Sequence, residues 1–121
     1  MLYCGLDLSR KRTDFHLLDE SGAVVEVGAV GADADALAGL ARRVAVYGLP
    51  VVAAVESMNG ARFVHDELER HGWEVLVADA AKVRGFAPVA CKTDKVDARV
   101  LAELAQRRLV PAIWLPDLEV R

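Results

Sequence analysis

Leu2-Tyr3-Cys4-Gly5-Leu6-Asp7 is an apolar run that ends in a carboxylate, and it decides how the rest of the chain is arranged. Such an unbroken run predicts a strand near the centre of a sheet, where both faces are buried. A second run, Val51-Val52-Ala53-Ala54-Val55, predicts another buried strand and is followed by Glu56. Carboxylates are unusual residues for packing, so two buried strands that end in acids indicate a polar site at one edge of a sheet.

Around these two runs, the sequence predicts an α/β domain with the element order β-β-β-α-β-α-β-α. The predicted strands are 2–7, 12–18, 23–29, 51–55 and 73–77, and the predicted helices are 33–47, 61–71 and 93–107. Residues 78–91 predict a loop that could include one helical turn. Antiparallel strands followed by strand–helix–strand units give a mixed five-stranded sheet with helices on its faces. This order resembles that of the ribonuclease-H-like fold, which carries acids on its first strand, near the end of its fourth strand and on its last helix.

Two further acids stand in the run Lys92-Thr93-Asp94-Lys95-Val96-Asp97-Ala98. With Thr93 as the N-cap, Asp94 and Asp97 lie in the first turn of the predicted last helix, where residues three apart share a face. Gathered carboxylates repel one another and raise one another's pKa, and divalent cations remove that cost. Mg²⁺ and Mn²⁺ prefer carboxylate and water oxygens. The sequence therefore predicts that Asp7, Glu56, Asp94 and Asp97 hold Mg²⁺ or Mn²⁺ for phosphodiester chemistry.

Composition narrows the partners and the compartment. The chain has 121 residues, 54% of them apolar, which suits one folded domain. No apolar run approaches the roughly 18 residues of a membrane span, and no signal peptide is visible, so we expect a cytoplasmic protein that does not insert in membranes. The formal net charge of −3 predicts weak binding of DNA or RNA by this chain alone. Cys4 and Cys91 have no metal-type spacing, and Cys4 is expected to be a buried core residue.

Weaker signals concern nucleic-acid phosphates. Lys92 and Lys95 flank the acid pair and could contact phosphates, or equally form salt bridges with neighbouring acids. Ser9 could bind phosphate next to Asp7, although its position favours a simple turn after the first strand.

Three stretches together resemble a known family. Gly5-Leu6-Asp7-Leu8-Ser9, Val55-Glu56-Ser57-Met58-Asn59-Gly60 and Lys92-Thr93-Asp94-Lys95-Val96-Asp97-Ala98 look like the N-terminal domain of the DEDD transposases of the bacterial insertion sequence 110 family. That domain is similar to Holliday-junction resolvases of the RuvC type. The resemblance implies metal-dependent cleavage and rejoining of DNA strands during transposition, with the acidic tetrad at Asp7, Glu56, Asp94 and Asp97.

The resemblance also implies parts that lie outside this sequence. Family members carry a C-terminal domain with a nucleophilic serine, act as oligomers and are guided by a structured RNA. Ser9, Ser21 and Ser57 do not match that serine. Residues 1–110 are therefore expected to be the catalytic domain, and residues 111–121 a linker toward a C-terminal domain that is missing here.

Two other classes of protein remain open from the residues. An actin-like or sugar-kinase ATPase lobe also begins with a strand that carries Gly-x-Asp, but it requires a second Gly-rich phosphate motif that this sequence lacks. A non-catalytic module for oligomerisation or RNA docking would use the same fold without metal. Tight ATP binding would identify the first, and an acidic crevice that binds no metal would identify the second.

Overall fold

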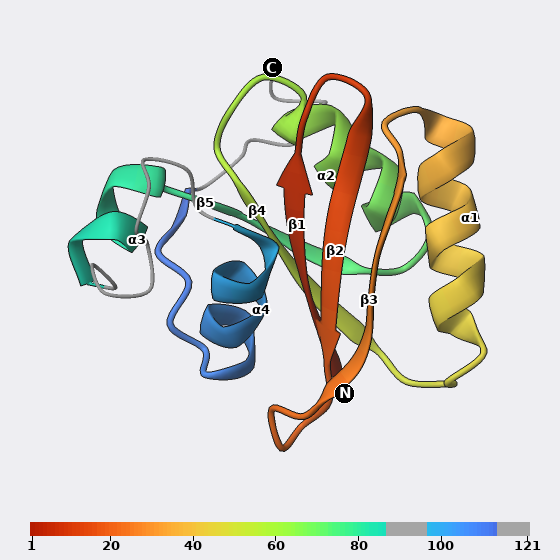
Figure 1. The fold of residues 1–121 in the computed structure, drawn as a ribbon, viewed down its shortest axis with the longest axis horizontal. Coiled ribbons are helices and arrows are strands. Elements are labelled where there is room, and N and C mark those ends of the chain that lie inside the picture. The colour runs from red at the N-terminus through yellow and green to blue at the C-terminus, as the bar shows by residue number, and fades with distance from the viewer. Residues whose placement is uncertain (87–96, 114–121) are drawn as a thin grey trace.

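The computed structural model describes residues 1–86 and 97–113. These residues form one six-stranded mixed sheet with helices on both faces (Figure 1). The strands are β1 Leu2–Leu8, β2 Arg12–Leu18, β3 Val24–Gly31, β4 Val51–Glu56, β5 Glu74–Ala78 and β6 Ala112–Ile113. The helices are α1 Ala34–Ala45, α2 Ala61–Arg70, α3 Ala80–Phe86 and α4 Ala98–Gln106. None of the helices in the described ranges is long and apolar enough to cross a bilayer.

The sheet order is β3-β2-β1-β4-β5-β6. The first three strands form an antiparallel meander, and β4 and β5 run parallel to β1 on its other side. β1 is therefore central, as its apolar sequence predicted, and the arrangement is consistent with a ribonuclease-H-like fold. The predicted count of five strands is wrong, because β6 adds an antiparallel pair to β5. Two residues are too few for a recognisable strand pattern in a sequence.

Two helices depart from the sequence-based prediction. In the described residues the last helix begins at Ala98, because Asp97 is extended (φ −84°, ψ 168°) and caps the helix. Asp97 is therefore the N-cap and not, as was predicted, a residue of the first turn. Where a loop was expected, α3 forms a helix of seven residues, and the Asp79 carboxylate accepts a hydrogen bond from the backbone N–H of Lys82 (3.2 Å). The prediction missed α3 because its sequence has little apolar periodicity.

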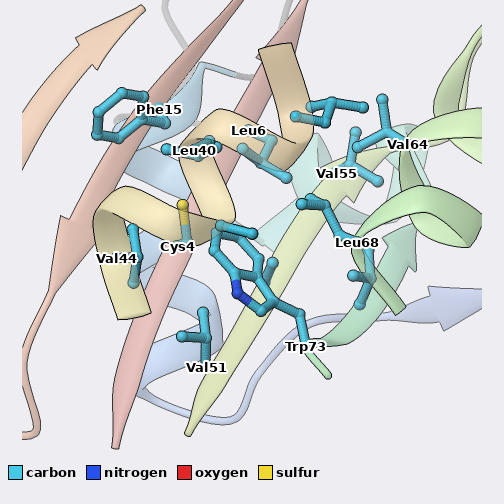
Figure 2. Packing of buried hydrophobic residues seen from close by; sticks show 14 of the residues in the cluster. Cys4, Leu6, Phe15, Leu40, Val44, Val51, Val55, Val64, Leu68 and Trp73 are labelled. Carbon is cyan, nitrogen blue, oxygen red and sulfur yellow. The ribbon is translucent and has the colours of Figure 1, made fainter. Parts of the chain in front are cut away.

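The core consists of two apolar layers, one on each face of the sheet. Alternate residues of β1 and β4 (Leu2, Cys4, Leu6, Val51, Ala53, Val55) pack beneath α1 and α2 (Figure 2). Burial raises the pKa of the Cys4 thiol to about 12, so this cysteine is an inert core residue, as predicted.

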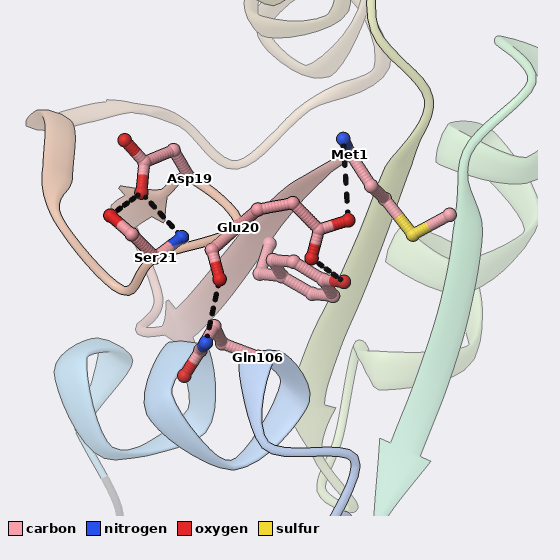
Figure 3. Close-up of polar contacts among 6 residues, drawn as sticks. Met1, Asp19, Glu20, Ser21 and Gln106 are labelled. Carbon is pink, nitrogen blue, oxygen red and sulfur yellow. Dashed lines mark hydrogen bonds and ion pairs between the residues drawn. The ribbon is translucent and has the colours of Figure 1, made fainter.

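The opposite face is covered by α4. Tyr3, Ala54 and Ala78 pack there against the apolar side of α4, including Leu101 and Ala102. Polar contacts hold the far end of this helix, where Gln106 donates a hydrogen bond to the Glu20 carbonyl (2.9 Å) and the Tyr3 hydroxyl donates to the Glu20 carboxylate (3.0 Å; Figure 3). The helix is thereby fixed across the central strands.

Candidate active site

Asp7 and Glu56 lie side by side at the carboxyl ends of two parallel strands. Leu6 of β1 pairs with Val55 of β4, so the next residues in the register are Asp7 and Glu56. Tyr3 and Ala54 both face α4. Asp7 comes four residues after Tyr3, and Glu56 comes two residues after Ala54. Because alternate residues of a strand share a face, the two acids project toward the α4 side of the sheet. The carboxyl ends of parallel strands are the usual place for ligand sites in α/β sheets.

Asp97 reaches the same side of the sheet through α4. Its Oδ1 accepts a hydrogen bond from the backbone N–H of Val100 (2.9 Å), which satisfies the first turn of the helix. The helix approaches β1 so closely that a Cβ on Gly5 would overlap the carbonyl oxygen of Ala98 and the backbone nitrogen of Ala102. Asp97 directly precedes Ala98, and Gly5 is two residues before Asp7. Because Gly5 has no side chain, α4 can pack closely on β1, and this places Asp97 near Asp7.

Glu56 has a basic neighbour that the sequence did not indicate. Arg84 Nη1 of α3 lies 3.6 Å from Glu56 Oε1, and the Glu56 side chain is only 15% exposed. A guanidinium at this distance forms an ion pair with the carboxylate and competes with any cation that binds it. This ion pair could be found only from the fold, because Arg84 and Glu56 belong to different elements.

Of the remaining predicted site residues, only Ser9 belongs to the part of the chain that the structure describes. Asp94, Lys92 and Lys95 lie outside the described residues. Ser9 follows β1 and is exposed; its hydroxyl donates to the Arg12 carbonyl (3.0 Å), which closes the turn into β2.

Two residues of β2 border the acids and were not predicted. Asp14 pairs with Asp7 across the β1–β2 ladder and forms an ion pair with Arg12 (3.2 Å). His16 pairs with Gly5, directly beneath α4. Alternation along β2 would have placed Asp14 and His16 on one face, but only the register puts them next to Asp7 and Gly5.

The charges around His16 come from α4. Burial lowers the pKa of His16 below its ordinary value, and Arg99 lowers it further. Glu103 and Asp97 act in the opposite direction. The N-terminus of α4 lies close to the sheet at this point, since a Cβ on Gly5, the partner of His16, would overlap the carbonyl oxygen of Ala98.

The donor chemistry of the three described acids suits a divalent metal. Carboxylate oxygens are the ligands that Mg²⁺ and Mn²⁺ prefer, and Asp97 still offers Oδ2 while Oδ1 caps α4. Within residues 1–86 and 97–113, however, no three His, Cys, Asp or Glu side chains are close enough together to hold an ion. The described residues therefore supply ligands of the right kind but not a closed metal site.

Comparison with known proteins identifies the family. No curated protein matches the chain. The family model for the DEDD transposases of the insertion sequence 110 type, described as "Transposase", matches residues 4–121, which is nearly the whole sequence. The chain belongs to the family of DEDD transposases of the insertion sequence 110 type.

Proposed function

We propose that this chain is the N-terminal catalytic domain of a DNA transposase and takes part in metal-dependent cleavage and rejoining of DNA strands. The observation that carries the proposal is the adjacent placement of Asp7 and Glu56 at the carboxyl ends of β1 and β4, on the face that α4 and Asp97 also reach. The family membership of the chain supports the same chemistry. An actin-like or sugar-kinase lobe is set aside on that ground.

Each acid has a distinct part in the proposed site. Asp7 and Glu56 provide carboxylates from rigid strands, and Asp97 provides its second oxygen from the N-terminus of α4. Asp94 is proposed as the fourth ligand on the sequence pattern alone. A bound Mg²⁺ or Mn²⁺ would stabilise negative charge on the phosphodiester oxygens. Arg84 forms an ion pair with Glu56 (3.6 Å) and would compete with the metal for that carboxylate.

The nucleophile and most of the nucleic-acid-binding surface are proposed to lie elsewhere in a longer protein. A serine in a C-terminal domain would attack the DNA. The catalytic domain would extend from the expected 1–110 to Ile113, because β6 pairs with β5, and the linker would follow β6. The formal net charge of −3 supports this division, because a strong DNA binder is usually basic. The full protein is proposed to act in the bacterial cytoplasm as a homo-oligomer on DNA, guided by a structured RNA.

Strand cleavage by the full-length protein tests the proposal. Asp7→Asn keeps the size of the side chain but removes its charge, and we expect cleavage with Mg²⁺ to fall by at least about a hundredfold. The matched control is Asp35→Asn, which changes an exposed acid in the first turn of α1. Normal cleavage by the Asp7→Asn protein would refute a catalytic role for this edge of the sheet and favour a non-catalytic module for oligomerisation or RNA docking.

A further inference from the structure

A small pocket lies at the same sheet edge as Asp7 and Glu56 but beneath α2. It has a volume of about 60 Å³ and is lined by residues that follow β1, begin β2 and begin α2, among them Ser9, Thr13, Asn59, Gly60 and Phe63. Nothing in the proposed metal chemistry uses these residues.

The N-terminus of α2 opens at this pocket without a capping side chain. Its N-cap is Gly60 (φ 90°), which has no side chain to cap the helix, and the first turn contains no acid. The N–H of Ala61 donates to the Met58 carbonyl (3.0 Å). In contrast, Asp33 caps α1 and Asp97 caps α4. The first N–H groups of a helix together with its dipole favour an anion. At α2 neither the N-cap residue nor the first turn supplies an acid for that position.

Thr13 provides an independent indication of a ligand. Its side chain is fully buried and lines the pocket, and among the described residues its Oγ1 has no hydrogen-bond partner. A buried hydroxyl without a partner is costly, so it normally has a binding role or an ordered partner. An acceptor oxygen in the pocket would satisfy it.

The surroundings favour a phosphate that belongs to a nucleic acid. The turn between β1 and β2 presents the exposed cations Arg10 and Lys11 beside Ser9. Phe63 is 43% exposed at the pocket, which offers an apolar surface for a sugar or a stacked base next to the phosphate. Basic residues attract the strand, and the pocket fixes one of its phosphates.

We propose that this pocket, between the β1–β2 turn and the N-terminus of α2, binds one backbone phosphate of a nucleic-acid strand. The inference rests on the proposed function, since it gives a strand at the acidic edge a fixed anchoring point. Thr13 donates from within the pocket, and the first N–H groups of α2 provide the charge preference.

The test is an NMR titration of this chain, labelled with ¹⁵N, at low salt and without divalent metal. One arm uses inorganic phosphate and the other a thymidine tetranucleotide. We expect the amide resonances of Gly60, Ala61 and Phe63 to shift in both arms, with tighter binding of the tetranucleotide. Shifts confined to other residues, or none in either arm, would overturn the proposal.

Three variants assign the contacts. Asn59→Asp adds a negative charge at the pocket and should weaken binding in both arms by about fivefold. Phe63→Ala should weaken only the binding of the tetranucleotide, again by about fivefold. Thr13→Val keeps the shape of the side chain and should weaken the binding of both phosphate and tetranucleotide by about threefold.

The control is Val24→Asp, which adds the same charge on an exposed position of β3 at the opposite edge of the sheet. If Asn59→Asp behaves like this control, the phosphate does not bind at α2. If Phe63→Ala weakens both arms equally, the nucleic-acid part of the proposal is wrong.

Adding Mn²⁺ to the same sample separates this inference from the proposed function. Phosphate shifts at Gly60 without paramagnetic broadening near Asp7 would support the pocket and contradict the metal site. Broadening near Asp7 without phosphate shifts at Gly60 would support the metal site and contradict the pocket.

Discussion

Gly5 sets how closely α4 can approach the central strand. Any side chain at this position would meet the backbone of Ala98 and Ala102, which cannot move without moving the whole helix. The placement of Asp97 relative to Asp7 therefore depends on a residue that has no chemistry of its own.

Gly5→Ala is expected to destabilise the domain by about 3 kcal/mol, near the upper end of what overpacking a core usually costs. The matched control is Gly39→Ala within α1, where the nearest atom is 3.9 Å from the new Cβ and the helix should gain up to about 1 kcal/mol. Urea unfolding measures both. Equal stability of the Gly5→Ala and native proteins would mean that α4 does not pack on β1 as described.

Arg84 is the other residue whose effect can be isolated. Its guanidinium is partly exposed, so its pairing with Glu56 is worth little on its own, but it opposes a second cation at that carboxylate. Arg84→Gln should raise the affinity of the chain for Mn²⁺ by up to about fivefold, measured by calorimetry.

The control for Arg84 is Arg70→Gln, which removes an exposed partner of Glu67 on α2. Weaker Mn²⁺ binding by the Arg84→Gln protein would reverse the assignment, because Arg84 would then be holding Glu56 in place for the metal.

At the scale of elements, α4 combines a structural and a chemical role in one residue. Asp97 caps the helix with one oxygen and is proposed to bind metal with the other. A substitution to alanine removes both roles, whereas asparagine is also a good N-cap and removes only the charge.

Asp97→Ala should therefore lower the free energy of unfolding by about 1 kcal/mol, and Asp97→Asn by much less. Both should abolish strand exchange in the full-length protein, without unfolding this domain. Urea unfolding and a strand-exchange assay give the two readouts. Normal strand exchange by the Asp97→Asn protein would remove Asp97 from the catalytic residues.

The same element shows where sequence-based prediction stops. The apolar positions of α4 predicted a helix and its buried face, but not its first residue. Thr93 and Asp97 are both good N-cap residues, and a sequence alone does not rank them. The structure resolves this at Asp97, where the extended backbone and the hydrogen bond to Val100 begin the helix.

For the whole molecule, apolar runs were enough to predict the central strands, and Asp7 and Glu56 at their ends. Their adjacency follows from the parallel pairing of β1 and β4, which sequence order made reasonable. Contacts between distant elements could not be predicted, because they depend on register and on helix placement. Arg84 beside Glu56 and Asp14 beside Asp7 are of this kind.

We propose that Asp7, together with Glu56 or Asp97, binds one divalent metal ion at the carboxyl ends of β1 and β4. Crystals of the chain soaked in millimolar Mn²⁺ test it most directly, through the anomalous signal of the ion. We expect an ion at the carboxyl ends of β1 and β4, bound by Asp7 together with Glu56 or Asp97 at roughly 2 Å. An edge that stays free of Mn²⁺ under these conditions, or an ion bound only elsewhere on the chain, would contradict it.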